Sequence, residues 1–397
     1  MINFMTSTPF LSADEAAALL GVNRRTLYAY VSRGLVASEP GPGPSRARRY
    51  PRASVEALLQ SRAASPAERA AADAIHWGLP VMTSQLTLIE DGRLFYRGRD
   101  AVELSTSASL EEVARLFWSD DADPADEHFA PTTSRRRGSD RHGTLLMAME
   151  HRLAQAPSRS LASVSSPTAI RLQAAATLVG DLVAAAGGIG PGTLAERLAR
   201  GWDSAEIRAM SAALVLCADH ELNVSAFTAR CIASADARLE HVLLGALCAF
   251  QGRRHGGMGI RVQVMLDDVD RYGLDRALDR VLAEQGAVPG FGHPLYPDGD
   301  PRCPAILAHV PDMSDAPALV AGRCAELGLM PNLDFALTTL ARRLSLPPDA
   351  GPAIFALGRS VGWIAHAFET WDDGALIRLR ARYVGRRPPQ LTRSDPA

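Results

Sequence analysis

The stretch VPGFGHPLYPDGDPR, residues 288–302, places histidine, aspartate and arginine among three glycines and four prolines. Glycine lacks a side chain, so it allows the backbone to approach a ligand closely. Arginine binds carboxylates through two parallel hydrogen bonds, and histidine exchanges a proton near neutral pH. This mixture predicts a loop that binds a small anionic molecule, with His293 and Arg302 as candidate functional side chains.

Segments of similar composition lie on both sides of this loop. They are Asp219–Ser225 (DHELNVS), Gly252–Gly257 (GRRHGG), Pro331–Phe335 (PNLDF) and a C-terminal set made of Phe355, Arg359, GWIAH at 362–366 and Arg378-Leu379-Arg380. Considered alone, His255 or His293 could equally be a structural histidine. A zinc site is disfavoured, because the histidines lack the i, i+4 spacing of a helical metal site.

The sequence around these segments is helical in pattern. Apolar residues recur at helical spacing in long runs at 170–186, 204–220 and 239–250. A β-hairpin is expected at 85–100, where Asp91-Gly92 allows positive φ at both turn positions. The irregular, charged stretch 119–143 predicts an exposed loop. The main body is therefore expected to be mainly α, with one short hairpin near its start.

Taken in order, these segments resemble the signature blocks of the citrate synthase family. The resemblance is carried by DHELNVSAFTAR, RRHGG, PGFGHPLYPDGDPR, PNLDF and GRSVGWIAHAFE, and by GRLFYRGRDAVELSTSASLEEVARLFW as the N-terminal block. It extends from about residue 76 to 390. It implies a dimer of mainly helical subunits, each with a large domain and a small domain, the small one inserted at about 220–335.

The resemblance also implies a reaction and a role for individual residues. The reaction is condensation of acetyl-CoA or propionyl-CoA with oxaloacetate to give citrate or 2-methylcitrate, with Asp334 as base, His255 polarising the thioester carbonyl and His293 donating to the ketone oxygen. Oxaloacetate would be bound by His220, Arg302, Phe355, Arg359 and Arg378, the last delivered by the neighbouring subunit. Coenzyme A would be bound by Val288, Pro289, Gly290, Phe291, Gly292 and Asn332. No metal and no bound cofactor are implied, since the coenzyme A thioester is a substrate.

Two departures from the family pattern lie beside His255. Met258-Gly259 stands where Ala-Asn is common, and Arg253-Arg254 replaces a usual Pro-Leu or similar pair. Neither removes a catalytic side chain. They could shift the turn that carries His255 or reshape the acyl pocket, so the choice between acetyl and propionyl thioesters stays open, a difference of one methylene worth about 1–3 kcal/mol.

Composition excludes several classes of function. The chain has 397 residues, of which 47% are hydrophobic, which allows two or three domains with large cores. It contains no lysine, so Schiff-base, pyridoxal-phosphate and P-loop chemistry are excluded. The five cysteines form no CxxC pair, which is typical of a reduced, cytoplasmic protein without a zinc site. Neither a signal peptide nor an apolar run of about 18 residues is evident, so no membrane association is expected.

The first 65 residues differ from the rest in charge, with eight arginines against four acids in a chain whose net charge is −2. Ser12 and Glu15 predict a capping box, Gly21 a helix end and Asn23 the cap of a second helix, 24–33, whose Leu27, Tyr28 and Val31 are expected to face inward. A third helix is expected at about 54–62. LSADEAAALLGVNRRTLYAYVSRGLV followed by RRY resembles the winged helix-turn-helix of the MerR/excisionase type. Duplex DNA would then contact Arg24, Arg25 and Tyr28 on the recognition helix and Arg46, Arg48 and Arg49 on the wing.

The predicted organisation is a winged helix-turn-helix domain at 1–65, a connector at 66–80, a citrate synthase-like domain at 81–390 and a tail at 391–397. Two hypotheses remain open. The chain is either an active synthase with an accessory head, or a DNA-binding regulator whose synthase-like body senses oxaloacetate or acyl-CoA. The intact set of His255, His293 and Asp334 favours the enzyme, because a pure sensor does not need the base. The head itself could instead be a protein-interaction appendage.

Overall fold

The structure is a computed structural model that describes residues 9–41, 47–63, 82–119, 129, 143–155, 165–310, 315–381, 383 and 385. The chain divides into two compact units, Met1–Thr83 and Ser84–Ala397, which are described separately below. The predicted connector at 66–80, the tail at 391–397 and Arg46 lie outside the described residues, as does the predicted loop at 119–143 except for Ser119, Phe129 and Gly143.

The N-terminal unit is a small winged helix-turn-helix. Its elements are β1 (Phe10–Leu11), α1 (Ala13–Leu20), α2 (Arg24–Ser32), β2 (Glu39–Pro40), β3 (Arg48–Pro51) and α3 (Arg52–Ala63), and the strands form an antiparallel sheet in the order β1-β3-β2. The predicted caps are confirmed: Ser12 and Glu15 form a capping box, Gly21 ends α1 at φ 63°, and Asn23 caps α2. The prediction that Tyr28 faces inward is wrong, since its side chain is 50% exposed while the neighbouring Leu27 is buried.

The C-terminal unit begins with the predicted hairpin. Strands β4 (Thr87–Glu90) and β5 (Arg93–Tyr96) pair around Asp91 and Gly92, whose φ angles are 49° and 71°. A third short strand, β6 (Arg99–Asp100), was not predicted, and it extends the sheet in the order β4-β5-β6. Asp100 then caps the next helix, so strand and helix follow each other without a loop.

The rest of this unit is helical, as predicted. Its helices are α5 (Ala101–Ser107), α6 (Leu110–Trp118), α7 (Leu145–Ala154), α8 (Thr168–Ala185), α9 (Leu194–Gly201), α10 (Ile207–Leu216), α11 (Val224–Ala233), α12 (Leu239–Phe250), α13 (Gly257–Tyr272), α14 (Leu274–Gln285), α15 (Arg302–Leu307), α16 (Ala316–Glu326), α17 (Leu333–Arg343) and α18 (Ala350–Asp373). The helix predicted at 204–220 is shorter at both ends, and its missing C-terminal part forms the irregular segment that carries His220.

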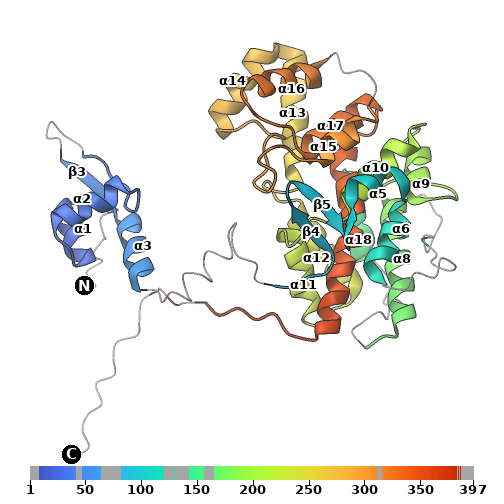
Figure 1. Ribbon diagram of the computed structural model, residues 1–397, viewed down its shortest axis with the longest axis horizontal. Coiled ribbons are helices and arrows are strands. Elements are labelled where there is room, and N and C mark those ends of the chain that lie inside the picture. The colour runs from blue at the N-terminus through green and yellow to red at the C-terminus, as the bar shows by residue number, and fades with distance from the viewer. Residues whose placement is uncertain are drawn as a thin grey trace, which may run out of the picture. The chain divides into compact units, whose positions relative to one another are not determined.

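Helix α18 is the central element of the C-terminal unit and is buried along nearly its whole length. In Figure 1 it runs between α11 and α12 on one side and α6 and α8 on the other, with the group formed by α13–α17 at its upper end. A Cβ atom at Gly358 would lie 2.4 Å from the carbonyl oxygen of Leu214, and one at Gly362 would lie 2.3 Å from that of Ala218. Only glycine therefore allows α18 to pack this closely against α10 and the His220 segment.

Among the described helices, α8 alone has the length and hydropathy of a membrane span. Its second half is buried against other helices of the unit, and its Asp181 forms an ion pair with Arg152 of α7. The helix is therefore described here as a core helix of the bundle.

Candidate active site

The structure brings His220, His293 and Tyr296 into direct contact. The rings of His220 and His293 are 5.1 Å apart and perpendicular, and His220 Nε2 lies 2.9 Å from the hydroxyl of Tyr296. Burial and the charges of Arg302 and Arg359 keep the pKa of His220 well below its ordinary value. Residues separated by more than 70 positions thus contact one another, and His220 is neutral there at pH 7.

His255 lies on the turn between α12 and α13. Its ring packs against Phe250 at 5.0 Å and Phe355 at 5.8 Å. Gly256 makes this turn possible, because a Cβ there would lie 2.2 Å from the Phe250 ring. Burial, and then the positive charge of Arg359, lowers the pKa of His255 to about 3. The imidazole is therefore neutral at physiological pH.

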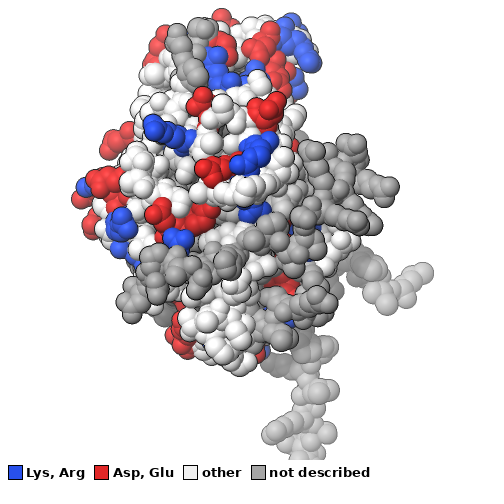
Figure 2. Space-filling model, turned by 90° about the vertical axis from the view of Figure 1, so that its right-hand side faces the viewer, with Lys and Arg blue, Asp and Glu red and all other residues white. Residues whose placement is uncertain are grey.

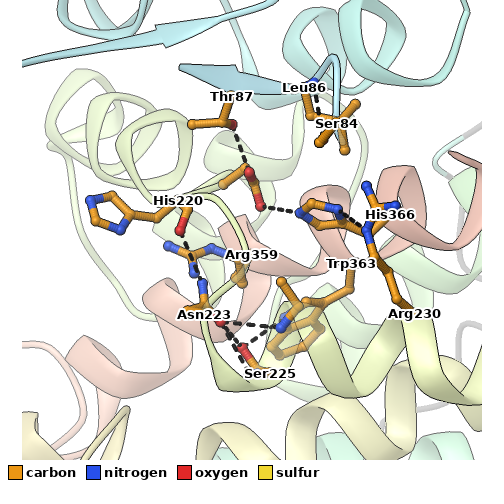
Figure 3. Close-up of polar contacts among 12 residues, drawn as sticks. Ser84, Leu86, Thr87, His220, Asn223, Ser225, Arg230, Arg359, Trp363 and His366 are labelled. Carbon is orange, nitrogen blue, oxygen red and sulfur yellow. Dashed lines mark hydrogen bonds and ion pairs between the residues drawn. The ribbon is translucent and has the colours of Figure 1, made fainter. Parts of the chain in front are cut away.

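Ser225 holds the other side of the His255 ring. Its Oγ lies 2.9 Å from His255 Nε2. The same Oγ accepts a hydrogen bond from Trp363 Nε1 at 3.0 Å and donates to Asn223 Oδ1 at 2.7 Å (Figure 3). Asn223 Oδ1 also caps α11 by accepting from two backbone N–H groups. The single hydroxyl proton of Ser225 therefore has two acceptors, Asn223 Oδ1 and His255 Nε2.

His293 is also held as a neutral ring with a defined tautomer. Its Nδ1 accepts a hydrogen bond from the Leu295 N–H at 3.2 Å, so the neutral ring carries its proton on Nε2. Burial and the nearby Arg302 lower its pKa to about 4. At pH 7 the ring is a neutral hydrogen-bond donor through Nε2.

Asp334 lies in the first turn of α17, which is tied to the His293 loop. Asn332 caps this helix, and its backbone and side-chain amide donate to the carbonyls of Gly290 and Gly292 at 2.9 and 3.0 Å. Gly290 has φ 81°, and a Cβ there would lie 3.0 Å from Cβ of Phe335 on α17 and 2.7 Å from a methyl group of Val262 on α13. The close packing fixes the loop against the helix that carries Asp334.

The carboxyl of Asp334 has an unusual pKa. Burial raises it to about 7 against the opposing effect of Arg302. A carboxyl with a pKa near the working pH is well suited to remove a proton from a weak acid and to release it again.

The two buried arginines differ in what they contact. Arg302 donates from Nε and Nη2 to both oxygens of Asp300, at 2.9 and 2.7 Å. Arg359 donates from Nε to the carbonyl of Cys217 at 2.8 Å and lies over the Phe355 ring, but its Nη1 and Nη2 are buried and have no hydrogen-bond partner. Unpaired buried donors are costly, and the two terminal nitrogens of Arg359 could donate to an anion.

The remaining predicted residues fall into two groups. Val288–Gly292 and Asn332 do lie together, joined by a β-bridge between Phe291 and Pro331, and the Phe291 ring packs on Phe335 at 4.9 Å. Arg378 lies on an exposed, extended segment after α18, and no contact of its side chain with the residues above is seen.

Within the described ranges, no group of three or more His, Cys, Asp or Glu side chains could hold a metal ion.

A buried polar network that was not predicted from the sequence lies behind His220. The Asp219 carboxylate accepts from Thr87 Oγ1 at 2.6 Å and contacts His366 Nε2 at 3.2 Å. His366 Nδ1 accepts from Arg230, which is ion-paired with Glu369. Figure 3 shows these polar contacts extending from Thr87 on strand β4 to Arg230 on α11 and His366 on α18. The sequence signal was His366 within GWIAH, which could not be linked to Asp219 before the fold was known.

The arginines of the N-terminal unit are partly engaged within it. Arg24 pairs with Asp14, Arg48 donates to Ser38, and Arg49 pairs with Glu39 while lying over the Phe10 ring. Arg25 and Tyr28 on α2 are exposed.

Comparison with known families assigns both units. Residues 75–380 match the model described as "Citrate synthase, C-terminal domain". The chain belongs to the citrate synthase family. Residues 10–63 match a model described as "Helix-turn-helix domain". The mainly helical fold with an N-terminal helix-turn-helix, predicted from the sequence, is thereby confirmed.

Individual relatives agree with this assignment. The citrate synthase of Haloferax volcanii is 35% identical over 195 residues, covering 46% of this chain and 52% of the relative. The 2-methylcitrate synthase of Mycobacterium tuberculosis is 26% identical over 353 residues, covering 78% and 89%. The alignments with the citrate synthase-type relatives of highest identity thus span about half of those proteins' length.

Solved structures share the fold. A citrate synthase from Thermotoga maritima superposes with a TM-score of 0.61 at 25% identity, covering 79% of this chain and 96% of that one. A citrate synthase from Thermoplasma acidophilum, described as a ternary complex with carboxymethyl coenzyme A and oxaloacetate, gives a TM-score of 0.64 at 21% identity, again covering 79% and 96%.

Proposed function

We propose that this chain condenses the acyl group of acetyl-CoA or propionyl-CoA with oxaloacetate, releasing citrate or 2-methylcitrate and coenzyme A. One observation carries the proposal. A carboxyl with a pKa of about 7 shares its surroundings with two neutral imidazoles and a buried arginine whose terminal nitrogens are unpaired. Relatives named citrate synthase and 2-methylcitrate synthase support the same reaction.

In this mechanism Asp334 removes a proton from the carbon next to the thioester carbonyl. His255 donates a hydrogen bond to the thioester oxygen, which stabilises the enol, and the enol carbon attacks the ketone of oxaloacetate. His293 donates its Nε2 proton to the ketone oxygen, which becomes a hydroxyl, and the proton that Asp334 took up then passes through water to His293 and restores both residues. Water then hydrolyses the resulting citryl thioester and releases coenzyme A. Neutral imidazole donors suit this chemistry because each can hydrogen-bond the oxygen on which negative charge develops.

The Ser225 hydroxyl can support the His255 tautomer that this role requires. When the Ser225 hydroxyl donates to Asn223, His255 carries its proton on Nε2 and cannot donate from Nδ1. When the hydroxyl turns to His255 Nε2, the ring proton moves to Nδ1, the nitrogen not engaged by Ser225. Binding of a thioester oxygen at Nδ1 would favour this second arrangement.

The dicarboxylate would bind at Arg359 and at the remaining donors of Arg302. Asp300 already neutralises Arg302, so a substrate with two negative charges needs further positive charge. We assign it to Arg378 of a second copy in a homodimer. The segment that carries Arg378 exposes Leu376 and Leu379, at 62% and 70%, which is the pattern of an arm that packs against another subunit.

The rate should depend on pH through Asp334. Because the base must be ionised and its pKa is about 7, kcat should rise with pH and level off above about pH 8. The imidazoles, with pKa values of about 3 and 4, stay neutral throughout this window. The measurement is thiol release at saturating substrates from about pH 5.5 to 9. A profile that is flat between about pH 5.5 and 8 would contradict the assignment of Asp334 as base.

The test of the reaction itself is thiol release from acetyl-CoA or propionyl-CoA in the presence of oxaloacetate. The ratio of kcat/KM for the two thioesters decides the acyl preference. Release of thiol without oxaloacetate would indicate simple thioester hydrolysis and would contradict condensation.

A second function, DNA binding, is favoured by the N-terminal unit. Its α2 leaves Arg25 and Tyr28 exposed at the position of a recognition helix. By contrast, acidic and basic side chains are interspersed over the face of the molecule shown in Figure 2, so that face has no basic field suited to DNA.

We expect the full-length protein to bind duplex DNA, with an affinity that falls steeply as the salt concentration rises. Arg25→Ala together with Tyr28→Ala should abolish most of this retention and leave thiol release unchanged. Arg323→Ala, an exposed arginine of α16, is the matched control. Retention that survives deletion of residues 1–63 would dismiss DNA binding by the head. If the chain binds DNA and oxaloacetate but releases no thiol, it is a regulator with a sensing body.

A further inference from the structure

We propose that Asp219 and His366 are positioning residues for Arg359: Asp219 is the buried counter-charge of this guanidinium, and His366 holds the Asp219 carboxylate in place. The inference rests on the proposed function, since it explains how the dicarboxylate site keeps a charged arginine ready before substrate arrives. It concerns residues that the resemblance to the family did not assign.

Asp219 lies against the face of α18 that carries Arg359 and His366. Arg359, Gly362 and His366 recur at i, i+3 and i+7, so they lie on one face of that helix. A Cβ at Gly362 would lie 2.7 Å from Asp219 Oδ1, so the glycine leaves space for this carboxylate against the helix. Arg359 Nε bonds to the carbonyl of Cys217, two residues before Asp219. Helix α18 and the Cys217–Asp219 segment therefore fix the position of Asp219 relative to Arg359.

Asp219 is fixed as a charged, acceptor-only group. It is fully buried, and its two oxygens receive separate donors, Thr87 Oγ1 at 2.6 Å and His366 at 3.2 Å. The donor role of His366 follows from Arg230, whose Nε–H occupies His366 Nδ1 at 3.0 Å and leaves the ring proton on Nε2. Arg230 is in turn held by Glu369, so the ring cannot flip without losing both contacts.

The hydrogen bonds of Asp219 go to other donors, and Arg359 keeps its terminal nitrogens unpaired. A direct salt bridge to Asp219 would occupy the groups that a substrate carboxylate needs. Asp219 is bonded to Thr87 and His366, and its charge acts on Arg359 through space without a hydrogen bond at Nη1 or Nη2. In a low-dielectric interior such a charge stabilises a buried cation at several ångströms.

The test compares substitutions that keep or remove these contacts. Asp219→Asn removes the charge at nearly constant shape. His366→Gln places an amide N–H near the position of Nε2 and preserves the donor to Asp219, whereas His366→Asn is one carbon shorter and reaches only toward Arg230. Oxaloacetate affinity is measured by calorimetry, and KM is measured separately for oxaloacetate and for the thioester. Thermal unfolding of each variant without ligand is recorded beside them.

We expect Asp219→Asn and His366→Asn to weaken oxaloacetate binding by about tenfold or more, with the thioester KM unchanged. His366→Gln should stay within about threefold of wild type, because one donated hydrogen bond is preserved. Two outcomes would overturn the inference and leave these residues a purely structural role. One is an equal rise in the KM values for oxaloacetate and for the thioester. The other is an oxaloacetate affinity that falls with the unfolding temperature of each variant and is the same for His366→Gln and His366→Asn. Wild-type protein that binds no oxaloacetate in the calorimeter would refute the proposed function, and the inference with it. Wild type that binds oxaloacetate but releases no thiol refutes only the synthase, and the Gln/Asn comparison then still decides the inference through binding.

Discussion

Asp334→Asn is expected to lower kcat by about 10²–10⁴-fold, the usual contribution of a positioned general base. Asparagine has nearly the same shape and can still follow the Asn332 cap, but its amide cannot accept a proton from carbon. Oxaloacetate binding should persist, because Arg302 and Arg359 are untouched. Thiol release with each thioester, measured beside calorimetric titration of oxaloacetate, separates the two effects.

The same substitution should stabilise the fold at alkaline pH. The pKa of Asp334 is about 7 in the folded chain against an ordinary 3.8, so the folded state binds more protons than the unfolded chain between these values. Stability contributed at this position therefore falls as pH rises from about 4 through 7. The asparagine side chain cannot ionise, so the Asp334→Asn variant does not lose this free energy of unfolding at high pH. The unfolding temperature of the variant should therefore exceed that of wild type at pH 8, and the two temperatures should be closer at pH 5.

Asp275→Asn provides the matched control, since Asp275 pairs with Arg323 at the surface. It should change neither kcat nor the pH dependence of unfolding. Turnover of Asp334→Asn within tenfold of wild type would remove Asp334 from the role of base. An unchanged unfolding temperature at pH 8 would show that the carboxylate is better solvated than its surroundings indicate.

Local signals allowed the ends of several elements to be predicted. Ser12, Asn23 and Gly21 act through hydrogen bonds or φ preferences within three residues of the helix ends, and Asp91-Gly92 acts within one turn. Such effects are visible in the sequence because the interacting groups are sequence neighbours. The helix expected at 204–220 is shorter at both ends. At its C-terminal end, the residues after Leu216 leave the helix and pack against α18.

The candidate site could be predicted in its residues but not in their arrangement. The ordered blocks identified the family and with it His255, His293 and Asp334. No sequence pattern revealed that Arg302 would pair with Asp300 while Arg359 would keep two nitrogens unpaired, because both depend on how α15, α18 and the Cys217 segment pack. The network from Thr87 to Glu369 joins residues 282 positions apart, beyond the reach of any local rule.

Arg359→Met should produce the second large effect, the loss of most oxaloacetate affinity. Methionine can fill the space of the arginine stem against Phe355 but supplies neither charge nor donors. Removing one partner of a buried, hydrogen-bonded charge pair costs about 2–5 kcal/mol in binding, a weakening of about 30-fold to several thousandfold. The measurements are the dissociation constant of oxaloacetate and the rise in unfolding temperature that oxaloacetate causes, which should be large for wild type and nearly absent for the variant.

Arg359→Lys separates charge from geometry at this position. Lysine keeps the positive charge near Asp219 but cannot form two parallel hydrogen bonds to a carboxylate. It should therefore bind oxaloacetate more weakly than wild type and more tightly than Arg359→Met. Arg323→Met, at an exposed arginine, should behave as wild type. Equal affinities of wild type and Arg359→Met for oxaloacetate would mean that the unpaired nitrogens of Arg359 face a different anion, and the dicarboxylate would then have to bind elsewhere.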